Sequence, residues 1–183
     1  MTTIVATRTL MVSDSRISEG NSHFHSPKLF RVDDSILGLA GDWEDALKFL
    51  EWFTAGADPN ATPEYEENTF DALELNHSGL YAWDKGLHRV TILNQHHAVG
   101  SGAQAALGAL FMGATPEQAI EAASQIDMFT SGPIQMFNLL PPLINERNHN
   151  ISSSTITDSG SSPVKTRSRK PKGRGDSLDL FGS

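Results

Sequence analysis

Short segments rich in Ile, Val, Leu and Thr follow one another along the first 40 residues, and polar breaks separate them. Runs of this length between turn residues are typical of β-hairpins. A similar series resumes at residue 70, where turns rich in Asn, Asp and Gly indicate a meander. The strands predicted from these patterns cover residues 3–8, 10–14, 28–32, 36–40, 70–75, 80–83 and 89–93.

Three other segments have the signals of helices. Asp42 is a suitable N-cap for a helix over residues 43–53, whose apolar positions fall on one face. An alanine-rich segment predicts a helix over residues 103–112, with a glycine directly after it. Thr115 precedes a proline and has a glutamine three residues later, a capping box that predicts a helix over residues 116–126.

The order of these elements predicts an α+β chain with a sheet-on-sheet core and helices packed outside it. We expect the folded domain to cover residues 1–143. Residues 54–68 contain Gly, two prolines and several acids, and are predicted to form a surface loop. Residues 144–183 are expected to be a disordered tail, because they hold too few apolar residues to offset the entropy of ordering.

The composition excludes several kinds of chemistry. Cysteine is absent from the 183 residues, so disulfides, thiolate nucleophiles and cysteine-ligated zinc are excluded. His23, His25, His96 and His97 have no further ligand at a metal-binding spacing, and we expect neither a metal nor another cofactor. No apolar run approaches the roughly 18 to 20 residues that span a bilayer, and no signal peptide is present. We therefore expect a cytoplasmic protein without membrane contact.

Charge is distributed unevenly along the chain. Residues 1–145 hold 18 acidic and 7 basic side chains, whereas residues 146–183 hold 4 acidic and 7 basic ones. The acidic body argues against nucleic acid as the main ligand, although the basic tail could touch phosphates weakly and without specificity. The tail ends in an acidic-hydrophobic segment, residues 176–181, which is either a docking motif for a partner or part of a solubilising tail.

The main candidate for chemistry is Thr2, directly behind a methionine that an aminopeptidase would remove. The exposed Thr2 would carry both a hydroxyl nucleophile and a free α-amine. An α-amine has a reference pKa of about 7.7 to 8.0, so it can accept the hydroxyl proton near neutral pH.

Six short motifs then occur in a defined order over residues 2–135. They are Thr2-Thr3-Ile4-Val5, Ser13-Asp14-Ser15-Arg16, Lys28 before a strand, Ala40-Gly41, Gly100-Ser101-Gly102 and Asp127-Met128-Phe129-Thr130-Ser131-Gly132. Together they resemble the motifs of the proteasome β-subunit superfamily, which includes HslV and belongs to the N-terminal nucleophile hydrolases. Thr130 stands where that family usually has serine, and the hydroxyl is retained.

The resemblance implies a four-layer α/β/β/α sandwich. One outer helix is expected to be shortened or missing, because a single helix separates Gly41 from the strand at residue 70. Such shortened forms resemble the proteasome-like proteins of bacteriophages and prophages. This likeness would place the protein in a phage-infected or prophage-carrying bacterial cell.

The resemblance also implies roles for seven residues. Thr2 would be the nucleophile, and the backbone N–H of Gly41 would face the oxyanion. Lys28 would disfavour protonation of the α-amine, with Asp14 holding Lys28 in place. The residues expected to orient the amine and its water are Ser101, Asp127 and Thr130. The matching substrate-pocket positions are Ile17, Phe30, Leu39 and Trp43, which imply an apolar or small side chain on the acyl side of the substrate.

The function predicted from these residues is a threonine endopeptidase that acts on peptides or unfolded protein. The resemblance implies a homo-oligomer, and a separate ATPase unfoldase would be needed for folded substrates, since the chain has no nucleotide-binding glycine loop. Two alternatives remain open. One is an N-terminal nucleophile hydrolase of small amides, and the other is a catalytically idle scaffold or adaptor that acts through its tail.

Overall fold

The computed structural model describes residues 2–65 and 69–139. Its strands form two antiparallel sheets and a separate hairpin. The first sheet has the order β10-β1-β2-β11 and consists of β10 (His96–Gly100), β1 (Thr3–Thr7), β2 (Leu10–Ser13) and β11 (Gln135–Asn138). The second sheet runs in sequence order and consists of β5 (Leu29–Val32), β6 (Ser35–Gly41), β7 (Phe70–Asn76), β8 (Gly79–Trp83) and β9 (Arg89–Ile92). The hairpin pairs β3 (Arg16–Glu19) with β4 (Ser22–His25).

The main core lies between the two sheets. Ile4, Ala6 and Met11 of the first sheet pack against the second sheet, where Leu73 and Leu75 are fully buried. In a strand, alternate side chains point to opposite faces, so Val5 and Val12 point to the other side of the first sheet. Both faces of the first sheet are therefore buried, which explains why the three central residues of β1, Ile4 to Ala6, are all apolar.

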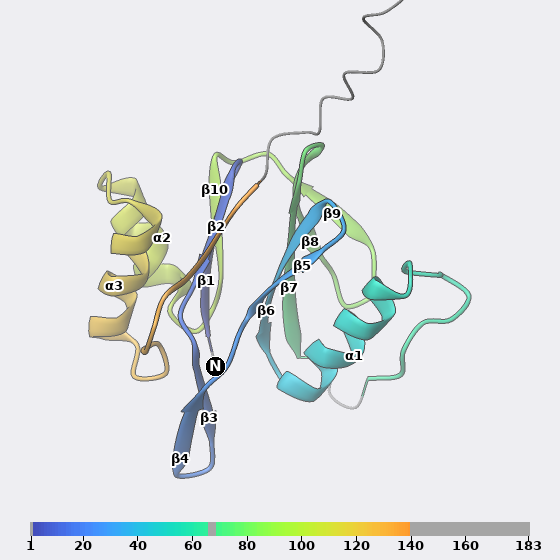
Figure 1. Ribbon diagram of the computed structural model, residues 1–183. Coiled ribbons are helices and arrows are strands. Elements are labelled where there is room, and N and C mark those ends of the chain that lie inside the picture. The colour runs from blue at the N-terminus through green and yellow to red at the C-terminus, as the bar shows by residue number, and fades with distance from the viewer. Residues whose placement is uncertain (1, 66–68, 140–183) are drawn as a thin grey trace, which may run out of the picture. The chain divides into compact units, whose positions relative to one another are not determined.

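Helices cover the outer face of each sheet, as Figure 1 shows. The helices α2 (Ala103–Phe111) and α3 (Pro116–Ile126) pack through their alanines on Val5 and Val12. On the second sheet, α1 (Trp43–Thr54) packs Phe49 and Trp52 against Leu37 and Leu39. None of the helices within the described residues has the length and hydropathy needed to cross a membrane.

The predicted elements are confirmed with small shifts at their ends. Asp42 caps α1, where its carboxylate accepts a hydrogen bond from the Asp45 amide at 2.9 Å. Thr115 and Gln118 form the predicted capping box at the start of α3. No second helix follows α1 among residues 55–65, and β7 begins at Phe70. The predicted tail, residues 144–183, lies outside the described residues.

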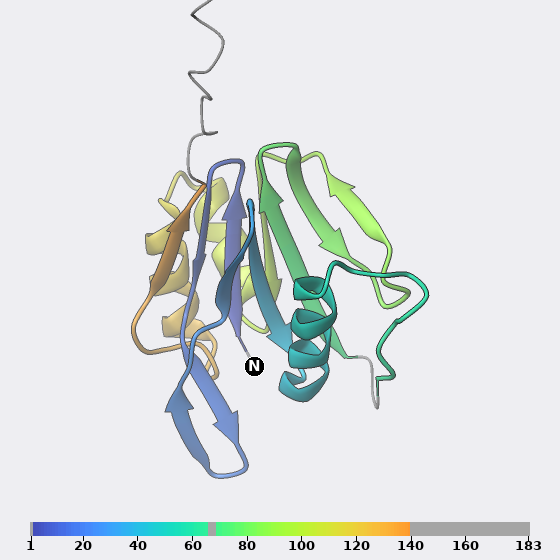
Figure 2. The same ribbon diagram turned by 45° about the vertical axis from the view of Figure 1, so that its right-hand side comes forward.

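Four strands, β3, β4, β10 and β11, were not predicted. β4 is exposed along its whole length, so it has no apolar alternation to reveal it. β10 and β11 pair with strands far away in the chain: β10 lies beside β1, and β11 lies beside β2. Figure 2 shows the β3–β4 hairpin extending beyond the two sheets, near the start of β1.

Candidate functional site

Thr2 lies where β1 begins, in the interior of the first sheet, and only 2% of it is exposed. The next residue, Thr3, lies opposite Gly100 on β10, while Ile4 lies opposite Ser13 on β2. The start of the chain is thus placed between two of the sequence motifs. Gly100 has a φ of +91°, and a side chain there would collide with the Thr2 carbonyl oxygen.

A buried ion pair, Lys28–Asp14, contacts the residue that follows Thr2. The Nζ of Lys28 is 3.0 Å from Oδ1 of Asp14, and both side chains are almost completely buried. Asp14 also accepts hydrogen bonds from three backbone amides, those of Thr3 at 2.8 Å, Arg16 at 3.1 Å and Ser131 at 3.2 Å. Lys28 donates a second hydrogen bond, to the Arg16 carbonyl oxygen. These contacts fix the carboxylate and the ammonium in one orientation.

Burial has a direct effect on the proton of Lys28. Loss of hydration disfavours the charged form and lowers the pKa of Lys28, while the attraction of Asp14 opposes this change only in part. The ammonium therefore releases its proton more readily than that of an exposed lysine. The ion pair with Asp14 favours the charged form of Lys28.

A chain of hydroxyls and one carboxylate contacts both Thr2 and Thr3. The Oδ2 of Asp127 accepts hydrogen bonds from Ser101 and Thr130, each at 2.6 Å. Thr130 is in turn 2.5 Å from the hydroxyl of Thr3, so the chain runs from β1 to the loop after α3. Partial burial raises the pKa of Asp127, but hydrogen bonds from Ser101, Thr130 and the Phe129 amide outweigh it and leave the pKa below its usual range. Asp127 is held as a carboxylate.

The turn after β6 completes the site. Gly41 has a φ of +90°, and a side chain there would collide with the carbonyl oxygen of Thr69. Only glycine adopts this conformation without strain, and it allows the chain to turn directly into the N-cap of α1. Gly41 and Thr2 line the same hollow of about 410 Å³. Asp14 thus contacts the residue that follows Thr2, Ser101 contacts Thr2 itself, and Gly41 lines the same hollow as Thr2.

No protein-family model matches the chain, and none of the curated proteins matches it. Solved structures do match. Thiobacillus denitrificans BPH in complex with epoxomicin aligns with a TM-score of 0.58 and 18% identity, covering 76% of this chain and 99% of BPH. The eukaryotic HslV from Trypanosoma brucei aligns with a TM-score of 0.56 and 20% identity, covering 74% of this chain and 98% of HslV.

The chain has an HslV/proteasome β-subunit-like fold. Thiobacillus denitrificans BPH without epoxomicin matches it as well, with a TM-score of 0.59. At 18 to 20% identity the likeness establishes the fold and leaves the activity to be argued from the site itself.

Two hollows of the HslV-like fold meet at the turn after β6. The first is lined by Thr2, Gly41, Asp42, Thr69, Asp71, Gly100 and Ser101. The second, of about 380 Å³, is lined by Ile17, Ser18, Glu19, Phe24, Gly41, Asp42, Trp43 and Glu44. Gly41 and Asp42 belong to both. A substrate that crosses the turn beside Thr2 would therefore contact both hollows.

The four predicted pocket residues are placed differently from one another. Ile17 and Trp43 line the second hollow. Phe30 packs against Trp43, with ring centroids 6.4 Å apart, and does not line that hollow. Leu39 is fully buried in the cluster beneath α1. Two of the four predicted pocket residues thus line the second hollow, together with the carboxylates of Glu19, Asp42 and Glu44, while β6 turns Leu39 into the core.

Two residues that support the site were not predicted. Thr3 contributes the hydroxyl that contacts Thr130, and its position next to Thr2 was the available signal. Gln135 on β11 accepts a hydrogen bond from the Lys28 amide at 2.7 Å and also contacts Ser13 at 3.5 Å. Nothing in the local sequence points to Gln135, since its role depends on β11 pairing with β2.

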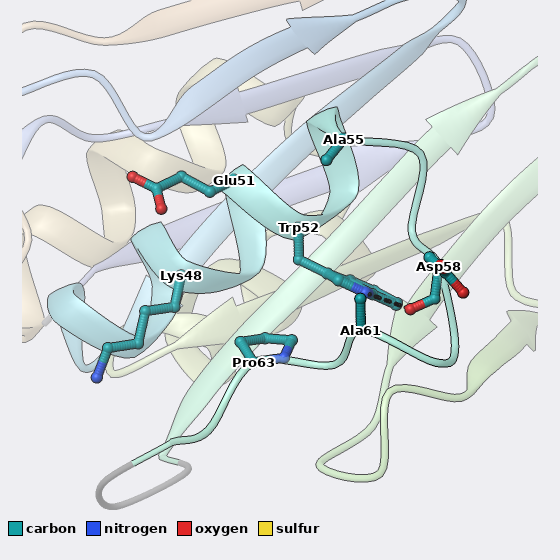
Figure 3. A pocket seen from close by; sticks show the side chains of 7 residues that line it. All are labelled: Lys48, Glu51, Trp52, Ala55, Asp58, Ala61 and Pro63. Carbon is teal, nitrogen blue, oxygen red and sulfur yellow. Dashed lines mark hydrogen bonds between the residues drawn. The ribbon is translucent and has the colours of Figure 1, made fainter.

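A larger hollow, of about 480 Å³, lies on α1 and the loop that follows it. Figure 3 shows Trp52 at its centre, where the indole N–H donates a hydrogen bond to the Asp58 carbonyl oxygen at 2.9 Å. The lining also includes Lys48 and Glu51 but none of the seven predicted catalytic residues. The larger volume therefore does not coincide with the predicted catalytic residues.

Proposed function

We propose that this protein is a threonine peptidase of the proteasome/HslV type, with Thr2 as nucleophile after removal of Met1. The observation that carries the proposal is that the Asp14–Lys28 ion pair contacts the Thr3 amide while Ser101, which also donates to Asp127, contacts the Thr2 carbonyl oxygen. Each group on its own has a structural explanation. Together they supply a nucleophile, a charged partner and hydrogen-bonding groups in one place, which acyl transfer requires.

In the proposed reaction, Thr2 Oγ1 attacks the substrate carbonyl carbon, and its proton passes to the Thr2 α-amine, directly or through water. The C–N bond of the substrate then breaks as the amine returns the proton to the leaving nitrogen. Water attacks the resulting ester and frees Thr2. The positive charge of Lys28 disfavours protonation of the α-amine, and Asp14 orients Lys28.

Two further groups stabilise this reaction in the proposal. The backbone N–H of Gly41 would donate to the oxyanion, a contact worth about 3 kcal/mol in comparable sites. Ser101, Asp127 and Thr130 would orient the α-amine and its water. The hydrogen bond of Ser101 to the Thr2 carbonyl oxygen, at 3.5 Å, supports this assignment.

We also infer that the two facing sheets and their helices form the four-layer α/β/β/α sandwich of N-terminal nucleophile hydrolases, with one outer helix lacking. The domain would span residues 1–143, with residues 144–183 as a tail. An oligomer is supported by the apolar side chains exposed near the ends of α2 and α3, which are Phe111, Met112, Ile126 and Met128. A cytoplasmic location and a separate ATPase partner remain part of the proposal.

The proposal is tested in two steps. Intact mass of the purified protein should correspond to the chain without Met1, since a retained Met1 would block the α-amine. A panel of quenched fluorescent peptides should then be cleaved by the parent protein and not by a Thr2→Ala variant, while Thr2→Ser retains part of the activity. Cleavage that persists in Thr2→Ala would overturn the assignment. Activity on small amides alone would favour the small-amide hydrolase, and no hydrolysis at all would favour the scaffold.

A further inference from the structure

The charged residues that line the two hollows beside Thr2 are all acidic. They are Glu19, Asp42, Glu44 and Asp71. They come from three separate elements: the end of β3, the start of α1 and the start of β7. Neither lining includes Lys, Arg or His. The side chains that line the two hollows thus have one sign of charge, and the nearby cations Lys28 and Lys48 are paired with Asp14 and Glu44.

Local structure explains only part of this arrangement. Asp42 is the N-cap of α1, and Glu44 lies in its first turn, where the helix dipole favours acids. Glu44 is also 3.0 Å from Lys48. Glu19 and Asp71 belong to strands, so no helix dipole accounts for them. Their position at the same hollows therefore results from the tertiary fold.

The second hollow combines these acids with an apolar wall. Ile17, Phe24 and Trp43 line it together with Glu19 and Glu44. Lys and Arg side chains have an apolar stem and a cationic head, and they bury the stem while the head stays near polar groups. An aromatic ring such as that of Trp43 also attracts a cation above its face. A wholly apolar side chain would instead take the carboxylates of Glu19 and Asp42 out of water without supplying a cation.

We propose that the site selects substrates with a Lys or Arg side chain next to the cleaved bond, and that Glu19, Asp42 and Glu44 determine this preference. The inference rests on the proposed peptidase function and specifies its substrate class. It replaces the apolar preference expected from the sequence. Opposite charges across the hollow would also accelerate encounter with a basic peptide at low ionic strength.

The first test compares peptides that differ only in one charge. One pair carries arginine or its neutral isostere citrulline before the cleaved bond, and a second pair carries them after it. We expect kcat/KM to favour arginine about tenfold or more in one of the pairs, which is the size of effect given by one or two charge contacts. This preference should shrink at 1 M NaCl, because salt screens partly exposed charges. Equal cleavage within both pairs would overturn the inference.

Charge-neutral variants identify the residues responsible. Asp42→Asn removes the charge and keeps an efficient helix N-cap, so its effect is not one of lost folding. Glu19→Gln changes an exposed strand end. Each variant should lower the arginine-to-citrulline ratio about three- to tenfold. Glu121→Gln, on the exposed side of α3, is the matched control and should leave the ratio unchanged. A ratio unaffected by Asp42→Asn and Glu19→Gln would count against the assignment.

A binding measurement separates this inference from the proposed function. The Thr2→Ala variant should bind the labelled arginine peptide more tightly than the citrulline peptide, as measured by fluorescence anisotropy. If neither peptide is cleaved by the parent protein but the arginine peptide binds more tightly, the peptidase proposal fails and the selectivity stands. If both are cleaved equally and bind equally, the selectivity fails and the peptidase proposal stands.

Discussion

Two ion pairs in this protein have the same length and very different surroundings. The Lys28–Asp14 and Lys48–Glu44 pairs each have a nitrogen–oxygen distance of 3.0 Å. The first is buried, with exposed fractions of 0% and 1%, whereas the second lies on α1 with exposed fractions of 30% and 69%. Charges attract more strongly where water is excluded, and a charge left alone there is much more costly. The nitrogen–oxygen distance alone therefore does not distinguish the ion pair of the candidate site from the ion pair on the surface.

Replacing the lysine of each pair with methionine should give the largest difference in unfolding free energy. Lys28→Met leaves Asp14 buried without its cation and should destabilise the protein by about 3–5 kcal/mol. It should also abolish peptide cleavage. Lys48→Met is the control and should cost less, because Lys48 is partly exposed and its pair with Glu44 is open to solvent, although Lys48 is also 3.6 Å from the buried Asp45. Urea unfolding of both variants checks the difference, and equal losses would mean that burial does not distinguish the two pairs.

Loss of a buried hydroxyl should reduce the unfolding free energy by an amount between those of the two lysine variants. Thr130 is 1% exposed and contacts both Thr3 and Asp127 through its hydroxyl. Thr130→Val keeps the shape of the side chain and removes both hydrogen bonds, so we expect a loss of about 1–3 kcal/mol in unfolding free energy.

Thr130→Ser provides the matched control, because it retains the hydroxyl and loses only a methyl group. Its peptidase activity should stay near that of the parent protein, while Thr130→Val should lower kcat. The hydroxyl chain would have no part in the reaction if the two variants had the same kcat.

Acid should weaken the partly exposed carboxylate of Asp127 in a defined pH range. Its pKa is lower in the folded protein than in the unfolded chain, so its contribution to stability is present above the unfolded pKa of about 3.9. That contribution is lost as the pH falls through the folded pKa. Between about pH 5 and pH 2, the parent protein should lose more stability than Asp127→Asn. Parallel curves from thermal unfolding at a series of pH values would contradict this prediction.

The smallest expected effect is the change that salt makes to the stability cost of the two lysine variants. At 1 M NaCl the cost of Lys48→Met should fall by a few tenths of a kcal/mol, because the Debye length is then about 3 Å. The cost of Lys28→Met should change little, since water and ions do not reach the buried pair. Urea unfolding at two salt concentrations measures both costs, and equal salt dependence would show that solvent reaches Lys28.

Local signals explain why much of the fold was predictable. The N-cap Asp42 and the capping box of Thr115 and Gln118 act within a few residues, so a sequence window contains all the groups involved. β4 pairs with the adjacent β3 but is exposed along its length, and β11 pairs with the distant β2, so neither shows a strong apolar alternation. They form because hydrogen bonds from another strand stabilise them, which a local pattern does not reveal.

The candidate site likewise has features that the sequence predicted and features that depend on tertiary contacts. Its residue types and their order along the chain, from Thr2 to Thr130, were readable because each lies in a short motif. The placement of Leu39 in the core was not, since it depends on which face of β6 meets α1. Gln135 was missed for the same reason, because its contact with the Lys28 amide exists only when β11 lies beside β2.

By itself, the sequence determined the kinds of chemistry that this protein holds: a threonine near its start, one lysine before a strand, two aspartates in separate motifs, and no thiol. Only the tertiary structure decided that Lys28 is buried against Asp14 and that Glu19, Asp42 and Glu44 line one hollow. The physical reason is that covalent order fixes which groups are present. Burial, pKa and the charge around a nucleophile depend on which distant segments the folded chain brings together.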